Sequence, residues 1–530
     1  MTYAYKPGPG LEQGKIASVA VGGSGGRVVS YEYDAQGRVY TVTAPDGKVT
    51  TFNARDVLGR VTQMTLPGGR VVTQGYDVDG NVTSVSPRGD ATHEMTYSLS
   101  GNLLESYLAP AVGAAPRTTS YVYDRDKMLK ELISPVLAGS LKQTILRDAA
   151  GRVTNVNETA GGANRTRVFT YNAVGQLSQQ VASETVGGTT TTATQTFGYA
   201  GSRHTTDTQT LTGGAARTLT RDHDNFLRPT SLALGGVASN LNYGYDLDGL
   251  VTNVGGLVAT RGSTVGLVKS LERTGQEKES FTYDSFGAPL TMNASYNGVA
   301  KGGLALTFDA ASGRIVTKAE SWTFGGLAAK AWTYDYDTTG RLAAASDGST
   351  TRTYTYDANG NRTGATVDTQ DRVTSQTDDA GITTTYTYDD HGNVLTRART
   401  GTPAQTLTWD SQGSLLSVTQ APSLPVKYIV DAQGRRVGRR LNGVLDREWF
   451  YDGQLRIVGE VVYVSGSRRG SGCMGTCPSA TCRSQSPRRS AQRRRRTAST
   501  ETTSAAFVRW WRAPPATWCR RCSIDRKSVV

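Results

Sequence analysis

The sequence predicts an all-β protein, a repeat array of about twenty β-hairpins that form one long antiparallel sheet. Three observations predict this fold. An aromatic-x-Tyr-Asp-x-x-Gly-Arg/Asn motif recurs, the glycines of neighbouring copies lie 20 to 22 residues apart over much of the chain, and helical periodicity is nowhere sustained. A repeat of about 21 residues accommodates two short strands with a turn at each end, so we expect each copy to be one hairpin.

Each copy of the motif contains the residues of a tight turn. Aspartate at the first turn position and glycine at the fourth are typical of a type I turn, in which the aspartate side chain bonds the backbone two residues on. The glycine then adopts the left-handed conformation and forms a bulge. In the weaker copy at 222–225 we expect Asn225 to take this conformation. The predicted structural repeat-turn residues are Tyr33, Asp34, Gly37, Asp77, Gly80, Tyr245, Asp246, Gly249, Tyr283, Asp284, Gly287, Asp337, Gly340, Tyr356, Asp357, Gly360, Tyr388, Asp389, Gly392, Asp410, Gly413, Asp431 and Gly434.

The runs on either side of each turn predict strands. Residues alternate between apolar and polar, as in Tyr354-Thr-Tyr356 before a turn and Arg60-Val-Thr-Gln-Met64 after one. Such alternation of aromatic and β-branched residues with polar ones is typical of half-buried strands. Since tyrosine occupies the same place in most copies, we expect the tyrosines to stack across strands as a structural ladder. Stacking of sugars on these rings is the alternative.

Charge and cysteine divide the chain. Its 530 residues include 58 Lys and Arg against 45 Asp and Glu, a net charge of +13. Residues 468–530 hold 15 of these bases, two of the acids and all five cysteines, so the rest of the chain is neutral and has no thiol. That main part offers no global charge for binding nucleic acid, and it excludes a disulfide scaffold, a thiolate zinc site and a cysteine nucleophile. We predict a lead-in or linker at 1–26, the repeat array at 27–467 and a basic tail at 468–530.

The repeat resembles the YD-repeat or Rhs (rearrangement hot spot) family, whose signature is this Tyr-Asp-x-x-Gly-Arg unit and whose relatives include Tc-toxin C subunits and teneurins. The resemblance covers about 85% of the chain, and residues 428–440 and 450–457 look like the late part of a bacterial Rhs core. It implies a sheet that spirals into a hollow shell around a toxin, which forms the C-terminus of the same polypeptide after a core-associated region. It also implies an exported, secreted or cell-surface protein, although the sequence shows neither a signal peptide nor a membrane span.

The tail departs from the family pattern. After Ser467 the alternation stops, and the Asp-His-Leu-Gly-Ser stretch usual in the family is missing. The codons of Glu501–Arg509, read two bases along, can spell Asp-His-Leu-Gly-Ser-Val-Arg. We therefore infer a frameshifted, disordered tail from near Arg468. A zinc site is disfavoured because the cysteine spacing is irregular and no histidine supports it; the run Arg493–Arg496 as a nucleic-acid or targeting patch is disfavoured by the frameshift.

We expect a non-catalytic scaffold, the encapsulating shell of a bacterial Rhs polymorphic toxin that lacks its toxin domain and core-associated region. Its expected partner is its own C-terminal toxin segment in the full-length protein. The alternative is a cell-surface adhesion or carbohydrate-binding repeat protein, which exposed aromatic patches would favour.

No catalytic, cofactor-binding or metal-binding residue is predicted: Asp77-x-Asp79-Gly80 resembles the start of a calcium loop but lacks the later ligand and the flanking helices. We read Gly22–Gly26 as a flexible linker and the opening residues as the interior of a longer protein.

Overall fold

The fold is built from β-strands. The computed structural model describes residues 1–472 except 23–25, 88–91, 113–114, 136–140, 161–162, 238–239, 264, 324–327, 379, 454 and 465–466. All of the regular elements in this part are strands, which confirms the all-β prediction. The described chain accordingly has no helix long and apolar enough to cross a membrane.

The first sheet has 31 strands. Their bounds are β1 (Thr2–Tyr5), β2 (Ile16–Val21), β3 (Arg27–Tyr33), β4 (Val39–Thr43), β5 (Val49–Arg55), β6 (Val61–Leu66), β7 (Arg70–Tyr76), β8 (Val82–Pro87), β9 (His93–Tyr97), β10 (Leu104–Val112), β11 (Ala115–Tyr123), β12 (Leu129–Ser134), β13 (Leu141–Arg147), β14 (Val153–Ala160), β15 (Ala163–Tyr171), β16 (Leu177–Val186), β17 (Thr189–Ala200), β18 (Arg203–Leu211), β19 (Arg217–His223), β20 (Pro229–Leu234), β21 (Leu241–Tyr245), β22 (Val251–Val254), β23 (Leu257–Arg261), β24 (Val268–Glu272), β25 (Glu277–Tyr283), β26 (Pro289–Tyr296), β27 (Val299–Phe308), β28 (Ile315–Trp322), β29 (Lys330–Tyr336), β30 (Leu342–Ser346) and β31 (Thr351–Thr353).

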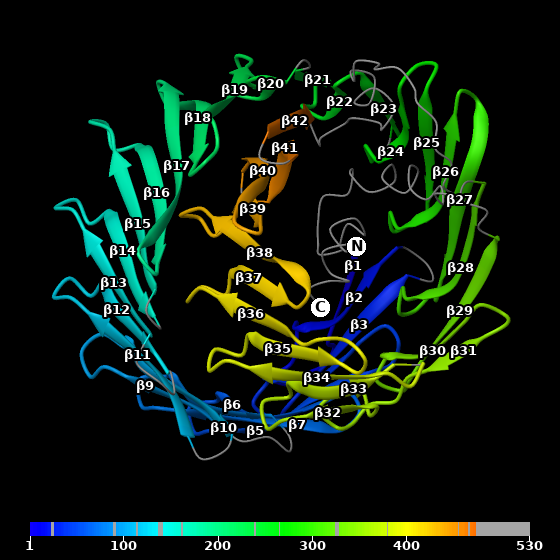
Figure 1. Cartoon of the computed structure of the whole chain (residues 1–530). Coiled ribbons are helices and arrows are strands. Elements are labelled where there is room, and N and C mark those ends of the chain that lie inside the picture. Colours follow the sequence, from blue (N-terminus) through cyan, green and yellow to red (C-terminus); the bar gives the residue numbers. More distant parts are fainter. Residues whose placement is uncertain are drawn as a thin grey trace. The chain divides into compact units, whose positions relative to one another are not determined.

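The second sheet has 11 strands. They are β32 (Ala365–Val367), β33 (Val373–Thr377), β34 (Thr383–Tyr388), β35 (Val394–Arg399), β36 (Gln405–Trp409), β37 (Leu415–Gln420), β38 (Ser423–Val430), β39 (Arg436–Leu441), β40 (Val444–Asp452), β41 (Arg456–Val464) and β42 (Ser467–Gly472). Each described pairing is antiparallel and joins strands that follow one another in sequence, so strand order in Figure 1 follows the colour bar. The chain is thus a long meander of hairpins.

Strands occur beyond both ends of the array that we predicted. β1 and β2 lie within 1–26, and β42 pairs with β41 as far as Gly472. Residues 23–25 of the predicted linker and the tail from Cys473 onward lie outside the described residues.

The chain divides into two compact units. Unit 1 comprises 1–120 and 260–381, and unit 2 comprises 121–259 and the chain from Ile382 onward. In unit 2 two layers of strands share an apolar core. Leu219 and Leu232 of the first sheet pack with Phe450 and Val461 of the second, because strand alternation directs one face of each sheet toward the other.

Candidate functional site: the repeat turns and the surfaces they dock on

The turn after β3 shows how the motif works. Asp34 Oδ1 accepts the backbone N–H of Gln36 at 3.0 Å and of Arg38 at 2.8 Å, while its Oδ2 accepts Arg38 Nε at 2.8 Å. The Gly37 N–H donates to the Asp34 carbonyl, and Gly37 has a φ of 72°. A side chain disfavours that backbone conformation, so aspartate, glycine and arginine together define one turn.

The same geometry recurs at the other predicted turns. In each, the aspartate Oδ1 accepts the backbone N–H four residues on, as at Asp77, Asp246, Asp284, Asp337, Asp357, Asp389, Asp410 and Asp431. The turn glycines have φ between 72° and 97°: Gly37, Gly80, Gly249, Gly287, Gly340, Gly360, Gly392, Gly413 and Gly434. The strand register shifts just before the aspartate, which places the bulge at each turn.

One copy begins two residues later than predicted, and further copies occur where the sequence motif predicted none. The copy that we assigned to 222–225 begins at Asp224, and Leu227, not Asn225, has the left-handed φ of 64°. A further copy begins at Asp368, where Asp371 has a φ of 57° in place of glycine. In both, the arginine four residues after the aspartate closes the turn, so the Asp-x-x-x-Arg spacing is the signal that would have found them.

The repeat tyrosine links one hairpin to the previous one. The Tyr33 hydroxyl donates to the Ile16 carbonyl at 2.8 Å, and the same bond recurs in later copies. These are Tyr76 to Val61, Tyr245 to Pro229, Tyr283 to Val268 and Tyr356 to Leu342, at 2.7 to 2.9 Å. Where tryptophan replaces tyrosine, Trp409 Nε1 donates to Val394 O at 2.8 Å, so the donor is retained. Tyr388, the remaining predicted tyrosine, pairs with Val394 across the strands.

In several copies the tyrosine ring lies against an arginine of the preceding repeat turn, and stacking of the tyrosines on one another stays a prediction. The guanidinium of Arg60 lies 4.7 Å from the Tyr76 ring centre, and Arg228 lies 4.5 Å from Tyr245. In each pair the arginine closes one turn and covers the tyrosine of the next copy. Such cation–π contacts contribute about 0.5–1 kcal/mol at exposed sites. The motif therefore couples each repeat to both neighbours.

The threonines of the motif form pairs on the opposite face of the sheet. Thr282 Oγ1 lies 2.7 Å from Thr291 Oγ1, and Thr387 Oγ1 lies 2.6 Å from its partner Thr396. Both pairs are exposed. Alternation places these hydroxyls opposite the tyrosines, so the face away from the aromatic side is a hydroxyl surface.

Each repeat has a turn at both ends of its strands. We call the row of Asp-x-x-Gly turns the repeat-turn edge and the row of turns between repeats the hairpin edge. In unit 1 the repeat-turn edge at 284–371 docks on the hairpin edge of β2–β10. The Arg27 guanidinium lies 4.3 Å from the Phe286 ring centre, Arg70 Nη1 donates to Asn359 O at 3.3 Å, and Gln370 Nε2 donates to Pro110 O at 2.6 Å. Hairpins 259 to 289 residues apart thus lie edge to edge.

Asp46 is the charged centre of this docking in unit 1. Its Oδ2 accepts Lys48 Nζ at 2.8 Å and Arg314 Nη1 at 2.7 Å. The hydrogen bonds from Lys48 and then Arg314 lower the pKa of Asp46 to about 2. The carboxylate stays ionised and holds the arginine of a distant repeat.

In unit 2 the repeat turns of the second sheet dock on polar side chains of the first. Arg167 Nη2 donates to Asp410 Oδ2 at 2.9 Å, and both side chains are more than nine-tenths buried. The neighbouring Ser411 hydroxyl donates to Glu158, which also pairs with Arg165 at 2.9 Å. Buried charges are costly unless paired, so these contacts specify where the turn sits.

Another buried carboxylate lies farther along the same unit. Glu448 on β40 is fully buried; its Oε1 accepts the Tyr463 hydroxyl at 2.8 Å, and its Oε2 lies 3.8 Å from Arg217 Nε. Burial raises the pKa of Glu448. In unit 1, burial and then the Glu277 carboxylate raise the pKa of Glu279 to about 7.

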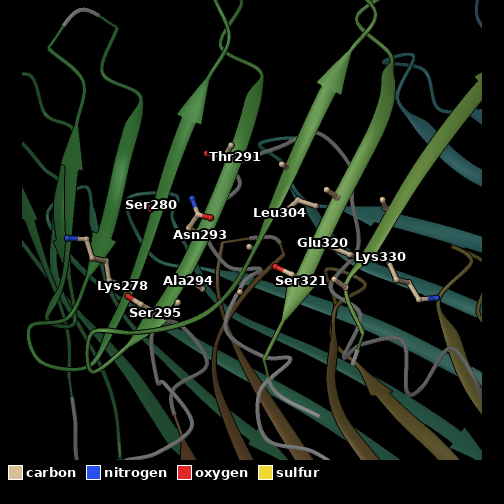
Figure 2. A pocket seen from close by; sticks show the side chains of 17 residues that line it. Lys278, Ser280, Thr291, Asn293, Ala294, Ser295, Leu304, Glu320, Ser321 and Lys330 are labelled. Carbon is tan, nitrogen blue, oxygen red and sulfur yellow. The ribbon is translucent and has the colours of Figure 1, made fainter. Parts of the chain in front are cut away.

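A shallow groove crosses β25–β29 of unit 1 (Figure 2). It has a volume of about 720 Å³ and is lined chiefly by small and polar residues, among them Ser280, Asn293 and Ser321, with Lys278 and Lys330 at its two sides. None of its lining residues is aromatic. No group of three or more potential metal ligands occurs within the described ranges.

Comparison with known proteins identifies the architecture. The Teneurin YD-shell family matches residues 12–458. Among solved structures, a TcdB2-TccC3-TEV protein is similar with a TM-score of 0.54 and 13% identity over 89% of this chain and 27% of its own. A Photorhabdus luminescens Tc holotoxin pore with a TccC3 mutation has a TM-score of 0.46 and 13% identity, over 82% of this chain and 27% of its own.

The chain thus spans about a quarter of the length of these solved structures. At 13% identity, the likeness to the TcdB2-TccC3-TEV protein shows the fold alone. No curated protein matches the chain. The family match covers more than four-fifths of the sequence and the whole run of repeat turns described above. The chain therefore belongs to the Teneurin YD-shell family.

Proposed function

We propose that this chain is the non-catalytic wall of an encapsulating shell, as the Rhs polymorphic toxins of bacteria use to contain their own toxin segment. The core-associated region and the toxin would follow the repeat array in the full-length polypeptide. The protein would be exported, secreted or surface-associated and act in competition between bacteria.

The observation that carries this proposal is the edge-to-edge docking of distant hairpins. Arg314 of one repeat binds Asp46 of another 268 residues earlier, within unit 1. When the later repeats of a sheet dock on the edge of its earlier repeats, the sheet can form a continuous wall that leaves no free turns along the joined edges. Such a wall is what containment requires.

The repeat residues have structural partners, which supports a scaffold rather than an enzyme. In the turn at Asp77 the carboxylate binds Asn81, and the ring and hydroxyl of Tyr76 contact Arg60 and Val61. An acid–base pair needs two titratable groups that converge on a substrate position. The recurrent carboxylates instead face their own turns.

The distribution of side chains favours containment over adhesion. The tyrosines lie half-buried on one face, and the opposite face carries paired hydroxyls such as Thr282 with Thr291. Carbohydrate binding generally uses exposed aromatic platforms, and the groove on β25–β29 has no aromatic lining residue.

The test is to sequence the gene beyond codon 467 from its source genome and to express the longest polypeptide that a single restored frame encodes. We expect a core-associated region and a toxin domain to follow, and the toxin segment to resist a protease that digests it when it is produced alone. A frame that encodes neither region, or equal digestion rates in the two preparations, would refute the proposal.

A further inference from the structure

Three consecutive repeat turns of unit 1 present apolar side chains to solvent. These turns begin at residues 56, 77 and 98, and their tips carry Val57, Leu58, Val78 and Leu99. The four side chains are 102%, 68%, 91% and 104% exposed. We call these four residues the apolar tips.

The turns themselves do not require apolar tips. The turn that begins at residue 56 is closed by the bonds that its aspartate makes to Leu58 N and to Arg60, neither of which uses a side chain at positions 57 or 58. Other turns of the array fill these positions with polar residues, as in Thr339 and Asn359. Exposed apolar groups at three successive turns therefore point to an interaction surface.

Phe286, which is 37% exposed, shows how an apolar tip can pack against a hairpin edge. This side chain belongs to the repeat turn after β25 and packs under the guanidinium of Arg27 at 4.3 Å. A β-carbon on Gly22 would lie 2.5 Å from the Phe286 ring, so the contact is close. The partner of this tip is the hairpin edge of β2 and β3. The apolar tips belong to the same repeat-turn edge and so have the geometry to dock on another hairpin edge.

The two edges match in spacing. Successive turns on either edge are two strands apart, about 9.5 Å in a regular sheet. One array can therefore place three consecutive repeat turns against three consecutive hairpin turns of another. Unit 1 does this internally, where Phe286, Arg314 and Thr339 of successive repeat turns lie against Arg27, Asp46 and Gly68.

Among the described residues of unit 1, a hairpin turn of the chain itself carries exposed apolar side chains. The turn between β26 and β27 in unit 1 carries Tyr296 and Val299, which are 38% and 59% exposed. We propose that the apolar tips bind this hairpin edge of a second copy of the chain, head to tail. Because the two surfaces differ, the contact is heterologous. After each copy is added, the assembly still has one set of apolar tips and one hairpin edge free.

Sedimentation velocity of the 530-residue chain over a range of concentrations tests this. We expect a ladder of species beyond the dimer. A tip variant with Val57→Ala, Leu58→Gln, Val78→Ala and Leu99→Asn should associate at least about a hundredfold more weakly, which corresponds to about 2.8 kcal/mol. The control variant Leu146→Gln, Leu455→Gln removes exposed leucines elsewhere and should associate like the unchanged protein.

A mixing experiment distinguishes head-to-tail docking from any other association. The hairpin variant Tyr296→Ser, Val299→Asp should also fail to form long species. An equal mixture of the tip variant and the hairpin variant should form a dimer and stop there, since it contains one intact pair of edges. A monomeric unchanged protein at all concentrations, an unaffected tip variant, or a mixture without dimers would overturn the proposal. Circular dichroism of each variant checks that loss of association is not loss of folding.

Discussion

The buried pair of Arg167 and Asp410 in unit 2 allows a quantitative test of how the second sheet is held on the first. The perturbation is Asp410→Asn. Asparagine retains the Oδ1 acceptor that bonds the backbone N–H groups of Gln412 and Ser414, so the turn is preserved. The substitution removes the charge and replaces the Oδ2 acceptor, which Arg167 Nη2 meets at 2.9 Å, with an amide nitrogen that can only donate.

The expected magnitude follows from burial. The side chains of Arg167 and Asp410 are 7% and 1% exposed, so removing the carboxylate leaves a guanidinium with neither water nor a full counter-charge. Breaking a buried pair by removing one partner costs about 3–5 kcal/mol. The amide nitrogen that takes the place of Oδ2 cannot accept the Arg167 N–H, so we expect a loss within that range, about 3–5 kcal/mol.

Hydrogen exchange measured by mass spectrometry is the suitable assay because it resolves strands and does not require two-state unfolding. Amides of β36 and β37 should exchange more than about a hundredfold faster in the variant, since each 1.4 kcal/mol is tenfold. The matched control is Asp246→Asn, at a repeat turn whose fifth residue is leucine. We expect that control to change local exchange by less than about fivefold.

A double-mutant cycle separates the pair from its surroundings. Arg167→Met should also destabilise β36 and β37, whereas the double variant should be at least about 2 kcal/mol more stable than the sum of the single effects predicts. A loss below about 1 kcal/mol for Asp410→Asn, or additive single effects, would refute the view that this ion pair locks the turn.

Three further predictions concern the repeat and its buried acid. Tyr76→Phe removes the hydroxyl that donates to Val61 O and should lower the free energy of unfolding by about 1 kcal/mol in urea titration; an unchanged midpoint would contradict the link. Leu227→Gly should raise the melting temperature, because a left-handed non-glycine residue costs about 1–2 kcal/mol, and a lower melting temperature would count against strain at that turn. Burial raises the pKa of Glu279 from 4.5 to about 7, so the contribution of this carboxyl to stability is complete below pH 4.5 and is lost as the pH rises through 7. Glu279→Gln should therefore stabilise the protein by about 3 kcal/mol at pH 8 and not at pH 4. An equal effect at both pH values would refute this assignment.

The sequence was sufficient to locate most repeat turns because their chemistry is local. Aspartate, glycine and the fifth-position arginine lie within five residues, so their spacing alone identifies the bonds. The error at Asn225 arose because we ranked residues by left-handed preference. At Leu227 the bonds of Asp224 to Arg228 outweigh that preference.

The docking contacts left no comparable trace in the sequence. The alternation of side chains shows that Glu158 on β14 and Arg167 on β15 each lie on the face opposite their neighbours in sequence. It does not show which face another sheet covers. Both are polar, and sequence rules place polar residues in solvent. They are buried because Ser411 and Asp410, some 250 residues later, supply their partners. Only the tertiary structure brings these pairs together.

The long separation between docking partners has a consequence for synthesis in the cell. Asp410 is translated 243 residues after Arg167. At about 5–20 residues per second, a ribosome needs roughly 12–50 s to make that interval. During this time the apolar face that includes Leu219 and Leu232 awaits Phe450 and Val461. The nascent chain therefore passes through a period of exposure in which chaperone binding, rather than native packing, is expected to prevent aggregation.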